Sequence, residues 1–390
     1  MAIGFLFLQI IIIIKTFQIK KIKVLHIAQA VGGVEICLRQ ISKNIDVSAF
    51  NNVIICQHLK DKPKFLDKFG NEIKTYHTSL VRNISPIDDI RSFFATIFIL
   101  IKERPAIIHA HSAKGGAIGR LASIFFDIPV IYTPHAFSYL STNNKFKKRA
   151  FLFLERILKF KNVNVLATSK SEQDRAVNEV GYDRKQTQVL ENAIDSIKTY
   201  SNNSTKILHE DYISSIGRPS YQKNTKMLID VFEVISKKHI HLHLYIVGAG
   251  EYSPELNKIK TQINSKKLND RITIIPWVSR KEAMTILKFS KLYVSTSIYE
   301  GMPYAVIEGL YLHKAMVLTN CDGNKDLIQD NFSGFLVKSK KEMIKKISFL
   351  LNDDTKRKQL EANAHKEYLK RHQIEIYIEK LTKIYNNITK

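Results

Sequence analysis

Short apolar runs with the composition of buried β-strands alternate with helical patterns along most of this chain of 390 residues. A polar segment around residues 196–205 interrupts the alternation, which then restarts. Parallel strands need a crossover helix between them, so the pattern predicts parallel sheets that are covered by helices on both faces. The strand-like runs are 21–30, 52–58, 106–111, 129–134, 162–169 and 187–192 before the polar segment, and 211–218, 241–250, 271–278, 291–297 and 314–320 after it, and helical patterns between them include 34–45, 88–103 and 116–126.

The restart after the polar segment indicates two consecutive α/β domains, which also suits the chain length. We expect residues 21–195 to form the first doubly wound, Rossmann-like domain and residues 206–365 the second. From about residue 340 to residue 390 the chain is helical and basic. Open parallel sheets bind ligands at the carboxyl ends of their strands. With two such sheets facing each other, the predicted site lies in the cleft between the domains.

The charge of the chain favours an anionic partner. Lys and Arg number 60 against 36 Asp and Glu, which gives a formal net charge of +24. A nucleic acid, a membrane surface or a phosphorylated substrate would suit this balance. Because Lys far outnumbers Arg, compositional drift explains the charge equally well. The cysteines Cys37, Cys56 and Cys321 are scattered, which suggests neither a disulfide framework nor a zinc site and fits a reducing cytosol.

The N-terminal segment 1–20 has two open interpretations. Residues 3–14 are almost wholly apolar and lysines follow them. A dozen residues is short for a membrane span, which needs about 20. No charged region precedes the apolar run and no A-x-A site follows it, so a cleaved signal peptide is not indicated. The segment is either a short membrane anchor with its basic flank in the cytoplasm or an apolar leader of no structural role.

Residues 145–161 form a basic amphipathic pattern that also allows two interpretations. Phe146, Phe153, Leu154 and Ile157 fall on one helical face, and lysines and arginines crowd the other. The apolar face could lie on an anionic membrane or grip a lipid acceptor. As an ordinary surface helix, it would instead bury this face in the protein core.

Two glycine pairs and two cations follow strand-like runs at positions suited to phosphate binding. Gly32 and Gly33 precede a predicted helix, and Gly248 and Gly250 follow HLHLYIV (241–247) in the same way. Backbone amides at glycines and helix N-termini bind anions. Neither glycine pair completes G-x-G-x-x-G, so each alone is as well explained as a simple turn. Arg218 and Lys223 lie on one loop, where they would suit a diphosphate or be plain surface charge.

The stretch YEGMPYAVIEGL places two carboxylates eight positions apart. Glu300 belongs to a tight Gly-Met-Pro loop, and Glu308 follows about one and a half turns into a helix that starts near Pro303. Carboxylates accept paired hydrogen bonds from vicinal hydroxyls of a ribose or a hexose. Taken alone, Glu300 as a helix-start charge and Glu308 as a solvated residue explain the stretch equally well. Combined with the cations and the glycine loops, the carboxylates indicate a nucleotide diphosphate sugar as the ligand.

These segments, in their order and spacing, resemble the retaining glycosyltransferases of family 4, which have the GT-B fold of two Rossmann-like domains. Within that family, the likeness is greatest to capsule and O-antigen polysaccharide transferases, and it spans about residues 22–388. The leader lies outside the pattern. The matching segments are GGVE (32–35), HAHSAKGGAIGRLAS (109–123), YTPHAFSY (132–139), ENAID (191–195), GRPSYQKN (217–224), IVGAGE (246–251), EGMPYAVIE (300–308) and SGFLV (333–337).

The resemblance implies a role for each matching residue of the second domain. Arg218 and Lys223 would neutralise the donor diphosphate and stabilise the departing nucleotide. Glu308 would hold the ribose hydroxyls and Glu300 the donor sugar. The residues that would shape the loops against the sugar and the phosphate are Gly248, Gly301, Met302 and Pro303.

The resemblance also implies roles for the first domain and the C-terminus. Gly32 and Gly33 would close on the diphosphate from the other side of the cleft. His135 in TPHAF would lie near the transferred sugar, whereas His109 and His111 would be structural or lie on the acceptor side. The last helix, 366–390, would pack back on the first domain. The family often has Leu or Val in place of Pro219 and Gly in place of Asn224, so the loop shape is expected to differ there.

The activity implied is transfer of a hexose, with retention, to a lipid-linked glycan acceptor in bacterial surface polysaccharide synthesis. No carboxylate is placed as a covalent nucleophile, so front-face attack assisted by the leaving diphosphate is expected. No D-x-D follows a strand, so we expect neither a metal nor another cofactor. The enzyme would act at the inner face of the plasma membrane, bound peripherally to its anionic surface.

Two alternatives to this activity stay open. A non-hydrolysing nucleotide-sugar epimerase shares the two-domain architecture and would also bind a nucleotide diphosphate sugar. A basic nucleic-acid-binding protein would explain the net charge. No aromatic-basic interleaving or recognised binding motif supports that second alternative, so we expect no nucleic acid as a partner.

Overall fold

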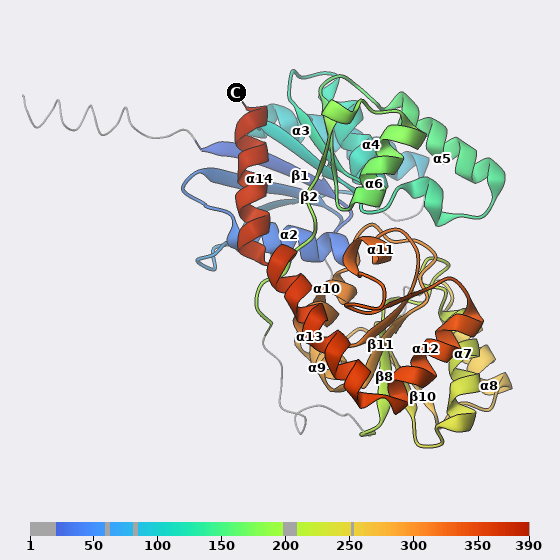
Figure 1. Cartoon of the computed structure of the whole chain (residues 1–390). Coiled ribbons are helices and arrows are strands. Elements are labelled where there is room, and N and C mark those ends of the chain that lie inside the picture. Colours follow the sequence, from blue (N-terminus) through green and yellow to red (C-terminus); the bar gives the residue numbers. More distant parts are fainter. Residues whose placement is uncertain (1–20, 59–62, 81–84, 198–208, 251–252, 390) are drawn as a thin grey trace, which may run out of the picture.

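The computed structural model describes residues 21–58, 63–80, 85–197, 209–250 and 253–389. They form two α/β domains, one above the other, and the C-terminal helices run along one side of both (Figure 1). Each domain is built on a parallel sheet with helices on both faces. The predicted architecture of two doubly wound domains is therefore confirmed. The predicted leader, residues 1–20, and most of the polar segment between the domains lie outside the described residues.

The first domain contains a seven-stranded sheet of order β3-β2-β1-β4-β5-β6-β7. Its strands are nearly all apolar because both faces are covered. Helices α3 and α4 pack against the face that carries Leu25 and Ile27, and α2 and the C-terminal α14 pack against the face that carries Val24. The strands are β1 Ile22–Ala28, β2 Phe50–Cys56, β3 Lys74–His77, β4 Ile107–His111, β5 Val130–Thr133, β6 Val163–Ala167 and β7 Thr187–Val189, and the helices are α2 Gly33–Asn44, α3 Pro86–Glu103, α4 Ser112–Ser123, α5 Lys145–Ile157 and α6 Lys170–Arg175.

The second domain contains a six-stranded sheet of order β10-β9-β8-β11-β12-β13. Every strand pair in it is parallel. The strands are β8 Tyr212–Ile216, β9 His243–Val247, β10 Ile272–Ile275, β11 Leu292–Ser295, β12 Met316–Thr319 and β13 Phe335–Val337. The helices are α7 Thr225–Lys238, α8 Leu256–Ser265, α9 Arg280–Phe289, α10 Tyr304–Tyr311, α11 Asn324–Leu327, α12 Lys340–Asn352, α13 Asp354–Arg371 and α14 Ile374–Ile388.

One apolar core continues from the first domain into the second. Helix α13 packs against α10, and α14 crosses to α2 of the first domain (Figure 1). Tyr385 of α14 is fully buried and donates or accepts a hydrogen bond at His109 Nδ1, at 2.7 Å. The same core holds Phe50 of β2 and Tyr304 of α10. The two sheets are therefore held as neighbours by apolar burial as well as by the chain connection.

Helix α4 begins earlier than the sequence predicted. The predicted range was 116–126, whereas the helix spans Ser112–Ser123. Its glycines allow the helix to pack closely onto the sheet. A Cβ at Gly115 would lie 2.5 Å from the Ile27 carbonyl oxygen, and one at Gly116 would lie 2.2 Å from the Tyr132 ring. The short strands β3 and β13 were also missed, because runs of four and three residues carry little periodicity.

Helix α5 contradicts the interpretation that its apolar face lies in the core. Phe146 is 82% exposed and Phe153 is 62% exposed. The helix is anchored instead by Glu155, which is buried and accepts hydrogen bonds from Arg120 Nη2 at 2.9 Å and the Tyr132 hydroxyl at 3.0 Å. An amphipathic pattern predicts an apolar face but does not say what covers it.

Candidate functional site

The carboxyl edges of the two sheets face each other, and the loops that leave them carry most of the predicted site residues. After β8, Gly217 lies so close to the Lys223 side chain that a Cβ there would be 2.8 Å from Lys223 Cε. Gly248, which follows β9 with a φ of +92°, lies next to Gly217. Arg218 is half-buried on the same loop. The structure thus brings Gly248, Arg218 and Lys223 to one edge of the second sheet.

Glu300 is the centre of a polar cluster at this edge. It is 7% exposed, and Lys223 Nζ donates to its Oε1 at 2.6 Å. Ser297 Oγ donates to the same oxygen at 2.7 Å, and Gln222 Nε2 donates to Oε2 at 2.9 Å. A buried carboxylate is stable only with such partners. The cluster fixes the Glu300 carboxylate and the Lys223 ammonium as a pair at the carboxyl edge of the second sheet.

The Gly301-Met302-Pro303 loop makes one of the contacts between the two domains. A Cβ at Gly301 would lie 2.8 Å from the Ala136 backbone nitrogen and 3.0 Å from the His135 carbonyl carbon. No larger residue fits there without movement of backbone. Asn192 Nδ2 donates to the Met302 carbonyl at 2.8 Å, and Pro303 precedes the first residue of α10. The loop therefore joins the second domain directly to the loop that carries His135.

Glu308 is buried within α10 rather than solvated, so the alternative of an exposed surface carboxylate is wrong. It is 3% exposed, and Arg280 Nε donates to its Oε1 at 2.9 Å. Burial raises the pKa of Glu308, and the Arg280 guanidinium opposes that rise. Arg280 also reaches Asp195 Oδ1 at 3.5 Å. Among the described residues, no hydrogen bond joins Arg280 or Glu308 to the Lys223–Glu300 pair. Glu308 therefore has a cation of its own, Arg280.

His135 lies in a strained loop that a buried glutamate holds in place. Both His135 and Ala136 have left-handed backbones, with φ of +52° and +76°, which costs free energy in residues other than glycine. Glu172 accepts hydrogen bonds from the Ala136 and Thr168 backbone amides, each at 2.6 Å. Burial raises the pKa of Glu172 and lowers that of His135 to about 4. The His135 imidazole is therefore neutral near pH 7.

The N-terminus of α2 faces the same cleft from the first domain. Gly32 precedes the helix with a φ of +60°, and nothing lies within 4 Å of the position that a Cβ would take there. A Cβ on Gly33 would touch the Tyr304 ring at 3.4 Å. The two glycines thus lie opposite the start of α10, with open space beside Gly32.

Comparison with known proteins identifies this arrangement. The model described as Glycosyltransferase Family 4 matches residues 31–197, and the model described as Glycosyl transferases group 1 matches residues 196–367. Together the two models span every strand except β1 and contain every predicted site residue. The chain is a family 4 glycosyltransferase.

Relatives with assigned names share most of the length of this glycosyltransferase. A UDP-Gal:alpha-D-GlcNAc-diphosphoundecaprenol alpha-1,3-galactosyltransferase of Escherichia coli is 27% identical over 333 residues, which cover 81% of this chain and 84% of the relative. The capsular polysaccharide biosynthesis glycosyltransferase CapM of Staphylococcus aureus is 24% identical over 389 residues, which cover 95% and 98%.

Solved structures share the fold of the glycosyltransferase. The sucrose-phosphate synthase of Thermosynechococcus elongatus superposes with a TM-score of 0.82 at 14% identity, over 94% of this chain and 99% of that one. The Anabaena protein Alr3699/HepE in complex with UDP-glucose has a TM-score of 0.77 at 18% identity, over the same shares. Both likenesses place the chain in the GT-B architecture.

Several residues of this site were not predicted from the sequence. Arg280 belongs to no motif recognised in the sequence. It is the first residue of α9 and lies inside the Ser279–Glu282 capping box, which follows a strand. A helix start also precedes Glu172. Ser169 is the N-cap of α6, and its side chain accepts a hydrogen bond from the Glu172 amide. Gln222 and Ser297 adjoin predicted residues, and only the fold shows that both point at Glu300.

Asn224 explains how the glycosyltransferase tolerates a departure from the family pattern. The family often has glycine at this position, and Asn224 adopts a left-handed backbone with φ of +48° and ψ of +46°. Asn accepts that conformation more readily than most residues. The loop that carries Arg218 and Lys223 therefore turns into α7 as a glycine would allow.

Proposed function

We propose that this glycosyltransferase transfers a hexosyl group from a nucleoside diphosphate sugar, with retention and without a metal, to a lipid-linked glycan. The observation that carries the proposal is the Lys223–Glu300 pair at the edge of the second sheet. Gly301, beside it, touches the loop of His135. A single ligand between these groups meets a cation, a carboxylate and a neutral imidazole. A sugar attached to a diphosphate has a complementary group for each.

The donor would lie along the edge of the second sheet. Arg218 and Lys223 carry positive charge toward the diphosphate. Gly248 leaves room for its close approach to backbone, and Gly217 leaves room for the Lys223 side chain. Glu308 accepts hydrogen bonds from the ribose hydroxyls. Arg280 supports this role, because its guanidinium favours the ionised carboxylate, which is the better acceptor.

Retention follows from the way in which the carboxylate nearest the donor is occupied. Glu300 already binds Lys223, Ser297 and Gln222, so it is held as a hydrogen-bond acceptor rather than as a free nucleophile. In the proposed step, the acceptor oxygen bonds to the anomeric carbon as the bond from that carbon to the phosphate oxygen breaks. The acceptor proton passes to the departing phosphate oxygen on the same face, and the two cations stabilise the charge on the diphosphate.

A lipid-linked acceptor is supported by what the relatives are named for. The Escherichia coli relative is named for an acceptor on diphosphoundecaprenol. A Campylobacter jejuni relative, 29% identical over 159 residues, is named for a glycan on undecaprenol diphosphate. We assign this chain an acceptor of the same chemical class, in the synthesis of a surface polysaccharide.

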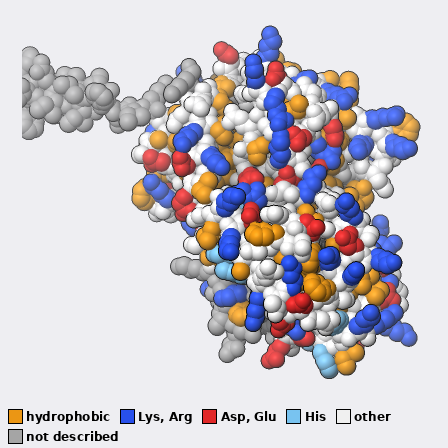
Figure 2. Space-filling model, viewed as in Figure 1, with side chains coloured by type: hydrophobic (Ala, Val, Ile, Leu, Met, Phe, Trp, Pro, Cys, Tyr) orange, Lys and Arg blue, Asp and Glu red, His pale blue; other side chains and the backbone are white. Residues whose placement is uncertain are grey.

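Exposed apolar side chains on the first domain support a peripheral position at the cytoplasmic membrane surface. Helices α3, α4 and α5 lie on the same side of that domain, and α5 projects from it with basic and hydrophobic side chains together (Figures 1 and 2). Among the described residues, no helix is both long and apolar enough to cross a bilayer. Lysines beside exposed rings suit an anionic lipid surface. The exposed apolar residues are Ile87, Ile90, Phe94, Phe98 and Ile101 of α3, Ile124 and Phe125 after α4, and Phe146, Phe153, Leu154 and Ile157 of α5.

The decisive experiment supplies UDP-galactose, and in parallel other nucleoside diphosphate sugars, with N-acetylglucosaminyl diphosphoundecaprenol in vesicles. We expect transfer of the sugar with an unchanged anomeric configuration, measured by NMR of the product, and undiminished rates with a chelator present. Epimerised donor formed without acceptor would show the epimerase instead. Salt-sensitive nucleic-acid binding without any response to nucleotides would contradict both enzyme assignments.

A further inference from the structure

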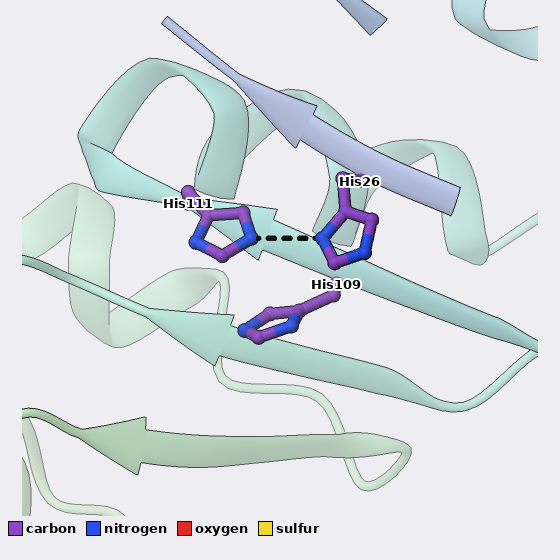
Figure 3. A group of neighbouring side chains, drawn as sticks. All are labelled: His26, His109 and His111. Atoms are coloured by element: carbon purple, nitrogen blue, oxygen red, sulfur yellow. Dashed lines mark hydrogen bonds between the residues drawn. The ribbon is translucent and has the colours of Figure 1, made fainter. Parts of the chain in front are cut away.

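Four histidines of the first domain form a continuous buried cluster that ends at the candidate site. The parallel register of β1 and β4 places His26 beside His109, and His111 follows two residues later on the same face of the sheet. Figure 3 shows the three rings together and the hydrogen bond between His26 and His111. All three are buried, whereas His135, after β5, is half-buried at the cleft.

Hydrogen bonds connect three of these rings in a line from Asn52 to His135. His26 Nε2 lies 3.2 Å from Asn52 Oδ1, and His26 Nδ1 lies 3.2 Å from His111 Nε2. His111 Nδ1 lies 3.2 Å from His135 Nε2. His26 and His111 each use both ring nitrogens, one toward each neighbour in the line, so the tautomer at one end determines the tautomer at the other.

The direction of the line follows from elementary hydrogen-bond chemistry. The amide oxygen of Asn52 can only accept, so His26 must carry its proton on Nε2. Burial lowers the pKa of His26 to about 4, that of His135 to about 4 and that of His111 well below its usual value, so the rings are neutral near pH 7. A neutral His26 then accepts at Nδ1 from His111 Nε2–H, and His111 accepts at Nδ1 from His135 Nε2–H.

We propose that Asn52, His26 and His111 are positioning residues that hold His135 in its Nε2–H tautomer, so that its Nδ1 accepts a hydrogen bond from a hydroxyl of the transferred sugar. Among the described residues, none donates a hydrogen bond to that nitrogen. The proposal rests on the proposed function, which places the donor sugar beside His135. An acceptor without charge is suited to this place, because it orients a hydroxyl without attracting the diphosphate.

The same histidines do not make a better cation site. The ligand atoms of His26, His109 and His111 lie within 4.8 Å of one another. However, His109 already pairs with Tyr385 and Thr133, and His26 pairs with Asn52 and His111. A metal would have to displace these hydrogen bonds in a fully buried place. The line of hydrogen bonds accounts for the same nitrogens without any such loss.

Asn52→Asp tests the proposal with an almost isosteric change inside β2. A buried carboxylate beside His26 stabilises the imidazolium, which donates from both nitrogens. His111 must then accept at Nε2 and donate from Nδ1, and His135 must accept at Nε2. The variant therefore moves the His135 proton to Nδ1 and removes the acceptor that faces the sugar. Asn51→Asp is the matched control, because Asn51 adjoins Asn52 on β2 with an exposed side chain.

The first readout is the tautomer of His135 in the full chain without substrate, measured by ¹⁵N NMR of labelled histidines and assigned with His135→Gln. We expect Nε2–H in the unmodified chain and in Asn51→Asp, and Nδ1–H in Asn52→Asp. The second readout is steady-state kinetics, in which Asn52→Asp lowers kcat roughly tenfold with little change in the donor KM. Should Asn52→Asp fail to fold, His26→Phe serves instead, because loss of the His26 acceptor favours the same reversal.

An unchanged His135 tautomer in a folded Asn52→Asp or His26→Phe chain overturns the proposal. A reversed tautomer with unchanged kcat also overturns it. The NMR result does not depend on the substrate, so failure of this proposal is distinguishable from failure of the proposed function. That second failure would appear as absent transfer by the unmodified chain.

Discussion

The two domains share one architecture, but at the facing sheet edges the second domain places charged groups and the first places neutral ones. The second sheet ends in charged groups that are paired with each other, Lys223 with Glu300 and Arg280 with Glu308. The first sheet ends in glycines and in imidazoles that burial keeps neutral. A nucleoside diphosphate needs cations and ribose acceptors, whereas a sugar in transfer needs orientation without a competing charge. Under the proposed function, this difference would assign donor binding to the second domain and sugar positioning to the first.

Loss of the cation in the second domain should have the largest effect. Lys223→Ala removes the proposed diphosphate contact and leaves the buried Glu300 carboxylate with Ser297 and Gln222 as its hydrogen-bond donors. We expect kcat/KM for the donor to fall roughly a thousandfold, as for other groups that stabilise a leaving charge. Steady-state kinetics and circular dichroism would measure activity and folding. Lys226→Ala, an exposed change three residues away, should retain activity, and equal rates for both variants would contradict the donor assignment.

Glu308→Ala should act mainly on the nucleotide. It removes the proposed ribose acceptor, and Asp195 is left as the carboxylate partner of Arg280. We expect the donor KM and the Kd of the free nucleoside diphosphate to rise by about a hundredfold, a loss of about 3 kcal/mol. Isothermal titration calorimetry would measure the second quantity. If the variant bound the nucleotide normally, Glu308 would be a structural partner of Arg280 and nothing more.

Acid should destabilise the first domain more than the second. His26 has a pKa of about 4 in the folded chain against 6.5 when exposed, so between these values only the unfolded chain binds its proton. The contribution of neutral His26 to the free energy of unfolding is therefore fully present above pH 6.5 and is lost as the pH falls toward 4. At pH 5 the loss is about 2 kcal/mol for this residue alone. His109, His111 and His135 shift in the same direction, which makes four such histidines in the first domain. The pKa is also lowered for His243 and His313 of the second domain and for His372 just before α14.

Hydrogen exchange at pH 7 and pH 5, corrected for the intrinsic rates, would measure this difference. Amides of β1, β4 and β5 should lose more protection than those of β8, β9 and β11. His26→Phe should reduce the pH dependence of the first domain and leave that of the second unchanged. Equal losses in both sheets would show that the histidine cluster does not govern acid stability.

The sequence predicted the fold well, but it predicted only part of the site. Periodicity located most strands, and loop motifs named Lys223, Glu300 and Glu308, because strand ends and helix starts leave local signals. Arg280 could not be assigned, since its partner Glu308 is reached only through the packing of α9 against α10. The line of hydrogen-bonded histidines could not be predicted from the sequence either, because the register of β1 and β4 determines which rings lie side by side. The sequence left both an exposed and a buried apolar face open for α5, because an amphipathic pattern is the same whether or not a core covers it.

The smallest expected effect comes from replacing a residue of left-handed backbone conformation by glycine. Each domain has such a residue in a loop near the candidate site. Ala136 in the first domain has a φ of +76°, and Asn224 in the second has +48°. Alanine pays more for this conformation than asparagine does, so Ala136→Gly should raise the free energy of unfolding by about 0.5 kcal/mol, whereas Asn224→Gly should change it by less than that. Chemical denaturation would measure both.

The same change should separate stability from activity. In Ala136→Gly the hydrogen bond from residue 136 to Glu172 persists, but the loop of His135 gains other conformations beside Gly301. We expect kcat to fall about threefold to tenfold in the more stable variant. The reason is that a loop with less backbone strain holds His135 less firmly in one position. Asn224→Gly should retain full activity, since glycine is what the family often has there. A more active Ala136→Gly chain would mean that the strain hinders transfer, and it would remove the first domain's loop from the list of groups that position the sugar.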